Sequence, residues 1–451
     1  GNRTVAVGTS ALFSQNVSDI AGNVGVGFTA GYYNVTGTLN TWIGHEAGLG
    51  ASGNSNSQNT GLGYRAGFSI TSGSNNTLLG RQTGLELEGG TDNVFVGMNA
   101  GAATLSGTEM VAIGTDALSL GVVTTGATGT VAIGQDALKN LVSGPQNTAI
   151  GSYNSDALTT GGYNTSVGRS TLGALTAGSH NIALGRATLT TAADDESDNI
   201  AIGNSALGSA KQDGTASSTN REVKRNIAIG TDALIGGTLT GTNHLEGNIA
   251  IGYTALDATG ANNQIGTVAI GHQSLSSLTS GNYNVAIGFQ TLYNTVTHQY
   301  NVAIGYTTLR DCVGNSNTGV GYASLRSTAA GQYNTALGHE SLYSNSSTSN
   351  NTAVGYQSGY YTTGADNTYV GYAAGKGASG AETNNVGVGS NALLSVTDGG
   401  YNVALGNEAM KANTTGDYNV AIGHQSMLVH DGGLRNIAIG AFAMKDTDAG
   451  S

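Results

Sequence analysis

The 451-residue sequence has few of the residues that brace or interrupt most folds. It contains one cysteine, one proline and one tryptophan, and only 10% of its residues are charged. A single cysteine excludes an intrachain disulfide framework and any multi-cysteine metal site. The absence of a Gly-X-Y period and the single proline exclude collagen and proline-rich linkers. Low charge combined with regularly spaced aliphatic residues is the reverse of a disordered composition.

Several functional classes are also disfavoured by what is missing. Acidic residues outnumber Lys and Arg by 28 to 16, giving a net charge of −12, so nucleic acid is not expected as a partner. No apolar run reaches 18 residues, so no helix is expected to span a membrane. No nucleophile elbow, Walker loop or His-Glu-x-x-His motif is present. We therefore expect no enzyme activity, no cofactor and no metal.

Glycine is abundant, with 73 residues, and its spacing reveals a repeat. The segment Asn-Val-Ala-Ile-Gly at 284–288 returns 17 residues later at 301–305, and a close variant occupies 334–338. With the closing glycine as a marker, there are 25 copies between Gly8 and Gly440, and 14 of the 24 intervals are 17 residues. A fixed period of this length is typical of stacked repeats. The sequence predicts an all-β parallel β-solenoid, or β-roll, of about 25 coils, as one repeat array over 1–451.

Each copy reads as one coil. The residues between the asparagine and the marker glycine alternate β-branched and small, which favours a short extended segment. After the glycine come two mostly polar residues, then Ala, Ser or Thr, then Leu or Met, which predicts a second short strand or corner. The residues that define the repeat are the asparagine, the aliphatic residue before the glycine and the glycine itself, represented by Asn284, Ile287, Gly288, Asn301, Ile304, Gly305, Asn334, Leu337 and Gly338.

The asparagine lies four residues before the marker glycine in 21 of the 25 copies. Stacked at strand spacing, each amide can bond the amide of the next coil or the adjacent turn backbone. We expect an asparagine ladder. A row of ligand-binding amides is the alternative, and a ladder explains the regularity without a ligand.

Two positions vary together. The residue two before the marker glycine is large in four copies, as Trp42, Leu78, Phe95 and Tyr369. All four copies have glycine, where most others have leucine, four residues after the marker. The two positions are therefore expected to share a pocket inside the coil. The Val/Ile face then points outward and needs cover from water, for which oligomerisation is the natural solution.

The longest interval, 27 residues between Gly203 and Gly230, contains an insertion around 208–225. Insertions in repeat proteins map to surface loops and often to the binding face. Its basic residues form a candidate partner-binding loop, against the simpler interpretation of a tolerated surface loop, and they are Lys211, Arg221, Lys224 and Arg225.

Tyrosine dominates the aromatic residues, with 20 copies against 6 phenylalanines. It favours the position before the asparagine, as in Tyr283 and Tyr300, and the position after the marker glycine, as in Tyr306 and Tyr322. Its apolar body and polar tip suit carbohydrate or protein contacts. Packing along the sheet is the simpler alternative.

The Asn-Val/Thr-Ala-Ile-Gly-x-x-Ala/Ser-Leu repeat resembles the head repeats of trimeric autotransporter adhesins of the Yersinia type. It is also similar to repeats of phage tail fibre proteins, and the resemblance covers essentially the whole chain. It implies a left-handed parallel β-roll in a homotrimer. The 17-residue period is longer than the adhesin unit, and residues 1–451 show no stalk or anchor pattern, which we expect to lie outside this segment.

These observations predict part of a longer, extracellular homotrimeric fibre on a virion or cell surface that presents or contributes to the binding of a host-surface receptor, a glycan among the candidates. A phage or virus tail fibre is preferred, and a bacterial trimeric adhesin head is the alternative. An ice-binding solenoid, which needs a flat array of exposed threonines, is the more remote one.

Overall fold

The computed structural model describes residues 3–16, 21–190, 196–209, 211–212, 223–239, 243–260, 262–327, 330–345, 347–377, 380 and 382–446. The chain divides into two compact units. The N-terminal unit comprises Gly1–Ile229 and Gly237–Thr242, and the C-terminal unit comprises Gly230–Gly236 and Asn243–Ser451. Each unit is a parallel β-solenoid, as the repeat predicts.

The main strands of the N-terminal unit are three residues long. They are β1 (Val5–Val7), β2 (Val24–Val26), β3 (Thr41–Ile43), β4 (Thr60–Leu62), β5 (Thr77–Leu79), β6 (Val94–Val96), β7 (Val111–Ile113), β8 (Val131–Ile133), β9 (Thr148–Ile150), β10 (Thr165–Val167), β11 (Ile182–Leu184), β12 (Ile200–Ile202) and β15 (Ile227–Ile229). This unit also holds the short strands β13 (Lys211–Gln212), β14 (Val223–Lys224) and β16 (Thr238–Leu239), and the 3₁₀ turn η1 (Thr125–Ala127).

The C-terminal unit has the same construction. Its main strands are β18 (Ile249–Ile251), β20 (Val268–Ile270), β21 (Val285–Ile287), β22 (Val302–Ile304), β23 (Thr318–Val320), β24 (Thr335–Leu337), β25 (Thr352–Val354), β26 (Thr368–Val370), β27 (Val386–Val388), β28 (Val403–Leu405), β29 (Val420–Ile422) and β30 (Ile437–Ile439). The short strands β17 (Leu245–Glu246) and β19 (Gln264–Ile265) pair in parallel beside them.

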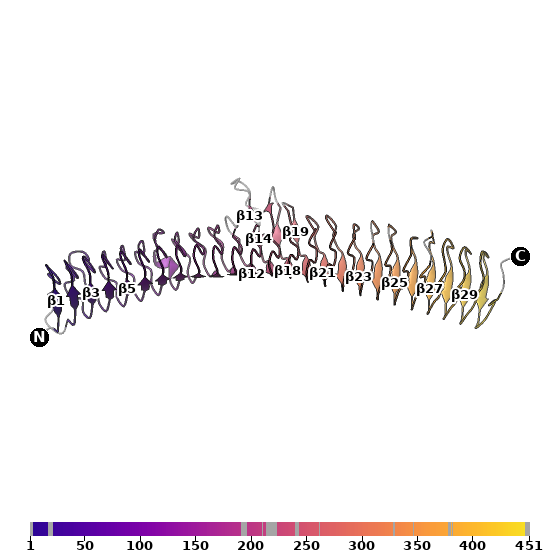
Figure 1. Ribbon diagram of the computed structural model, residues 1–451, viewed down its shortest axis with the longest axis horizontal. Helices are drawn as coiled ribbons and strands as arrows, with labels where there is room; N and C mark the ends of the chain where they lie inside the picture. The colour runs from indigo at the N-terminus through magenta and orange to yellow at the C-terminus, as the bar shows by residue number, and fades with distance from the viewer. Residues whose placement is uncertain are drawn as a thin grey trace. The chain divides into compact units, whose positions relative to one another are not determined.

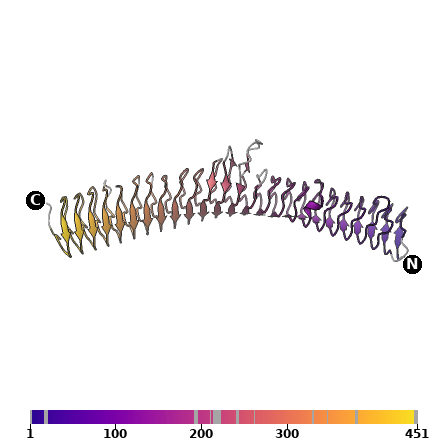
Figure 2. The ribbon, with the colours of Figure 1, turned by 180° about the vertical axis from the view of Figure 1, so that it is seen from behind.

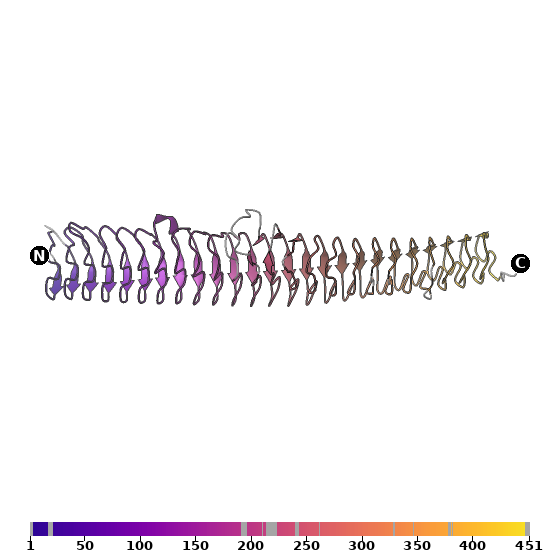
Figure 3. The same ribbon diagram turned by 90° about the horizontal axis from the view of Figure 1, so that it is seen from above.

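Within each unit, one repeat makes one coil, with the strand at one edge and the turns opposite it (Figure 1). The strands of successive coils pair in parallel and in exact repeat register, so that Val285, Ala286 and Ile287 face Val302, Ala303 and Ile304. The arrows of the C-terminal unit point the same way in Figure 2, and those of the N-terminal unit do so in Figure 3.

For the Ala-Leu pair, the sequence predicts a second short strand or a corner. In the typical coil the corner is confirmed and the strand is wrong. Residues 289–294, which follow β21, form consecutive turns. Gln290 and Leu292 both have a φ of +50°, which is the left-handed region and is incompatible with an extended strand. Leucine at this position therefore folds back into the coil from a turn, and it is buried.

The marker glycines are required by both conformation and space. Gly97 has a φ of +131°, and a Cβ atom there would lie 2.6 Å from the carbonyl oxygen of Gly114 in the next coil. No L-residue adopts that backbone region readily, and no side chain fits against the neighbouring backbone. This double requirement explains why the glycine recurs in every coil.

The predicted shared pocket inside the coil is confirmed. The Trp42 ring is fully buried, and a Cβ atom on Gly48 would overlap it. Phe95 fills the same space beside Gly101, where an added Cβ would lie 2.5 Å from the ring. Other coils fill it with a buried pair such as Ala286 and Leu292. A large residue on the strand thus replaces the leucine of the turn.

The predicted asparagine ladder is also confirmed. The buried Asn334 side chain donates from Nδ2 to the Asn317 Oδ1 at 3.1 Å and to the Thr348 carbonyl at 2.8 Å. Its own Oδ1 accepts from the backbone amide of Asn351 at 2.9 Å. Each amide therefore ties its strand to the next coil and to a turn, which satisfies backbone groups that burial would otherwise leave unpaired.

Helix is almost absent from the part of the chain that the structure describes. Among the residues described, none of the helical structure has the length and apolar composition needed to cross a bilayer.

Candidate interaction surfaces

The outer side of each main strand forms an apolar face, here called the outward face. In every described main strand except β1, the central residue is buried and the two flanking residues are partly or fully exposed. Ile304 is 37% exposed and Leu337 is 47% exposed. Because strands of successive coils lie about 4.8 Å apart, these side chains form a continuous aliphatic stripe within each unit.

The residues that define the repeat thus divide into three structural roles. Asn284, Asn301 and Asn334 are buried in the ladder. The marker glycines of the same coils form the corner after each strand, with φ between +134° and +140°. The aliphatic residues before them, Ile287, Ile304 and Leu337, belong to the outward face.

The candidate partner-binding loop is only partly described. Lys211 lies in β13 and Lys224 lies half-buried in β14. Arg225 follows β14 with an exposed side chain, and its backbone amide donates to the Ser197 carbonyl at 3.3 Å. Arg221 lies outside the described residues. Partner binding by this loop stays a prediction.

The C-terminal unit carries a column of stacked rings directly after its marker glycines, here called the ring ladder. Its eight members are Tyr253, His272, Phe289, Tyr306, Tyr322, His339, Tyr356 and Tyr372. Neighbouring ring centroids lie 4.7 to 5.5 Å apart. The planes of Tyr306 and Tyr322 differ by only 2°. Stacking of this kind contributes about 0.5–1.5 kcal/mol per pair beyond burial, so the ladder stiffens the coils that carry it.

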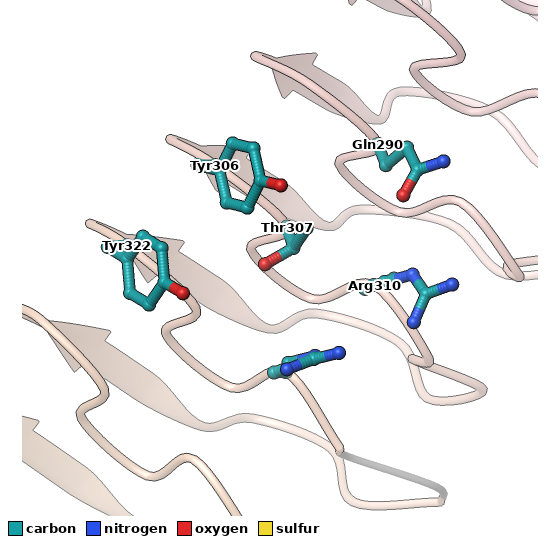
Figure 4. Close-up of a pocket in the computed structure, with 6 residues that line it drawn as sticks. Gln290, Tyr306, Thr307, Arg310 and Tyr322 are labelled. Atoms are coloured by element: carbon teal, nitrogen blue, oxygen red, sulfur yellow. The ribbon is translucent and has the colours of Figure 1, made fainter.

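A surface hollow of about 370 Å³ lies beside the centre of this ladder. It is lined by Gln290, Tyr306, Thr307, Arg310, Tyr322 and Arg326, all from the C-terminal unit. Figure 4 shows Tyr306 and Tyr322 parallel at one side, with their hydroxyl groups directed toward the side of Thr307 and Arg310. The two arginines occupy the same position of successive coils, and the Asp311 amide donates to the Arg326 carbonyl at 3.0 Å.

Two arginines and no acidic residue line the hollow, although the chain as a whole is acidic. Among the described residues, no carboxylate forms an ion pair with Arg310 or Arg326. Each guanidinium lies instead over a tyrosine ring. Arg310 lies over Tyr293 of the preceding coil, and Arg326 lies over Tyr343 of the following coil. These contacts orient the two cations without neutralising them.

Two carboxyl groups away from this hollow have strongly raised pKa values. Burial raises the pKa of Glu382 to about 7, against the opposing effect of hydrogen bonds from nearby backbone amides. Burial also raises the pKa of Asp257 to about 6. Both groups favour the neutral form more strongly than an exposed acid does. No group of three or more His, Cys, Asp or Glu residues suited to a metal ion occurs within the described ranges.

The arginine pair was missed in the sequence because each member is an isolated cation 16 residues from the other. Only an alignment of the two coils places them side by side. Comparison of the chain with protein-family models and with curated proteins gives no match.

Proposed function

We propose that this chain is the shaft or head of an extracellular homotrimeric fibre, of the phage tail fibre type, that holds and contributes to a receptor-binding surface. The bacterial trimeric adhesin head is the alternative with the same assembly. The repeat motif supports both, through its resemblance to these fibres, and the parallel β-solenoid is compatible with both.

The observation that carries the proposal is the outward face. Its aliphatic side chains lie on the far side of the sheet from the coil interior, where the described part of the chain leaves them partly or fully exposed. A continuous apolar face of this kind is typical of an interaction site. A fibre that stacks identical coils presents the same stripe on each chain, so a symmetric assembly can bury all copies at once.

A second candidate is binding to ice or another regular lattice. Four threonines at one outward position, Thr318, Thr335, Thr352 and Thr368, are paired in strand register in successive coils. A regular threonine row is what such binding needs. In the three coils directly before this row the same position is valine, as Val268, Val285 and Val302, which favours burial of the face over ice binding. Thermal hysteresis by a monomeric protein would place this candidate first.

Solution mass by light scattering coupled to size exclusion tests the assembly. We expect a mass near three times the 45.0 kDa of one chain. Ile287→Asp with Ile304→Asp places two charges on the outward face and is expected to lower that mass, because a charge buried in an apolar interface is costly.

The chain offers a matched control in the same two coils. Val296 and Val313 are 42% and 41% exposed on the turns. Their double change to aspartate introduces the same charge outside the outward face and is expected to leave the mass unchanged. Equal effects of the two double variants, or a stable wild-type monomer, would contradict the proposal.

A further inference from the structure

We infer that the hollow between Tyr306, Tyr322, Arg310 and Arg326 binds an acidic oligosaccharide, with a carboxylate or sulfate held by the two arginines. This inference rests on the proposed attachment role and specifies the chemistry of the receptor. Four features of the hollow support it.

The first feature is the arginine pair. Two like charges on adjacent coils repel one another, and among the described residues no carboxylate lies within ion-pair distance of either guanidinium. The nearest candidate in sequence, Asp311, accepts instead from the Asn294 side chain. The planar guanidinium fork matches the geometry of carboxylate and sulfate oxygens, so an anion would satisfy both side chains.

The second feature is the pair of tyrosine hydroxyls. Tyr306 and Tyr322 are 49% and 45% exposed, and among the described residues neither hydroxyl hydrogen-bonds to the protein. A phenol can both donate and accept, which suits a sugar hydroxyl. Because the rings are stacked, they present their edges and hydroxyl groups to the hollow rather than their faces. We therefore expect the sugar to be held by hydrogen bonds along the ladder, and not by stacking between rings.

The third feature is spacing. The Tyr306 and Tyr322 centroids lie 5.5 Å apart, and the ladder continues through neighbouring coils at 4.7 to 5.3 Å. One monosaccharide in an extended chain has a similar length. An oligosaccharide that runs parallel to the stacking direction from Tyr306 to Tyr372 would therefore meet a tyrosine or histidine at each of five successive coils, whereas Phe289 on the other side of Tyr306 offers no polar group.

The fourth feature is rigidity. Arg326 Nη1 donates to the Tyr343 hydroxyl at 2.8 Å, and Gln290 donates to the Gln273 side chain at 2.9 Å. Side chains that are already held lose less conformational entropy when a ligand binds. A neutral polysaccharide would use the hydroxyl row but not the arginines, so the acidic class is favoured.

The test is calorimetric titration of the assembled wild-type protein at low ionic strength. The probes are a galacturonic acid hexasaccharide, a chondroitin sulfate hexasaccharide and neutral maltohexaose. We expect binding of one or both acidic probes, weakened by added salt, and no binding of maltohexaose. Preference between the acidic probes identifies carboxylate or sulfate as the recognised group.

Arg310→Gln with Arg326→Gln is expected to weaken binding by at least about tenfold, because each charge-assisted hydrogen bond is strong. Arg169→Gln with Arg186→Gln is the matched control, since these exposed arginines also occupy successive coils, with no adjoining ring ladder. It makes the same change in net charge and should leave affinity unchanged. Tyr306→Phe with Tyr322→Phe keeps the stacked rings, removes the hydroxyls and should also weaken binding.

Equal loss of affinity in both arginine double variants would show non-specific charge attraction and overturn the inference. Binding of maltohexaose as tightly as the acidic probes, or no binding of any probe, would also overturn it. Failure of the proposed trimer and failure of the proposed ligand can be told apart. A trimer that binds no acidic probe contradicts only the ligand, whereas a monomer that binds one contradicts only the fibre.

Discussion

The pocket shared by strand and turn predicts that two harmful substitutions will compensate one another. Trp42→Ala removes a fully buried indole and leaves an empty space next to Gly48. Large-to-small changes of this kind cost about 3–5 kcal/mol. Gly48→Leu alone forces a side chain into the space of the ring, which costs about 3 kcal/mol or more.

Combined, the two changes recreate the pair found as Ala286 and Leu292. The backbone already permits leucine, because Leu292 has a φ of +50° and Gly48 has a φ of +59°. The indole also fills the space beside Gly61 in the next coil. Leucine at position 48 does not refill that space, so the double variant regains only part of the lost stability. We expect the double variant to be destabilised by about 1–3 kcal/mol, and therefore a coupling of about 3 kcal/mol or more between the two sites.

Hydrogen exchange, measured by mass spectrometry on peptides that cover β3 and β4, reports the loss of stability in these two coils. Trp42→Ala should accelerate exchange by roughly two to three and a half orders of magnitude, at about 1.4 kcal/mol for each factor of ten. Most of that increase should disappear in the double variant, and Gly61→Ala as a third change should recover more. Exchange in the double variant as fast as the two single effects combined would refute the shared pocket.

Three further results are expected. Gly97→Ala should destabilise its coil by about 3 kcal/mol or more through strain and overlap, whereas Gly260→Ala, where an added Cβ meets nothing within 4 Å, should have little effect on the melting temperature. Asn334→Ala should cost about 2–3 kcal/mol, because the buried amide of Asn351 loses its acceptor, and faster exchange at that amide would show it. Because the folded pKa of Glu382 is raised from 4.5 to about 7, its stabilising effect is complete below about pH 4.5 and is lost as pH rises through 7, by roughly 3 kcal/mol in total. Glu382→Gln should remove this pH dependence from thermal melts, and an unchanged profile would contradict the assignment.

Much of the fold can be predicted from the sequence because every coil has the same steric, hydrogen-bonding and packing requirements. A glycine that must avoid the next backbone, an amide that must bond its neighbour and an apolar pair that must fill one space each leave a periodic trace. The sequence therefore reveals the roles of Gly288 and Asn284. It also reveals that a large strand residue, such as Trp42, takes the place that a turn leucine, such as Leu292, fills in other coils.

Other features leave weaker traces. The sequence left open whether a second short strand or a corner holds the Ala-Leu pair, and the left-handed φ of Leu292 makes that segment a turn. Leucine rarely adopts this conformation, and here packing of its side chain inside the coil compensates the strain. The hollow depends on Arg310 and Arg326 becoming neighbours through stacking, and a single arginine in a repeat carries no such information. The two tyrosines beside them were identified as a column, but not as the wall of a site.

The most direct test of the central claim is intersubunit cross-linking at the outward face. Ile304→Cys places a thiol on that face, and a short trifunctional maleimide can join three such thiols. The native Cys312 is an internal control, because burial encloses it and raises its thiol pKa to about 11, which makes it unreactive at neutral pH. We expect covalent trimers from Ile304→Cys and none from the wild-type chain. Monomers alone from Ile304→Cys, at concentrations where the label reacts fully, would contradict burial of this face between chains.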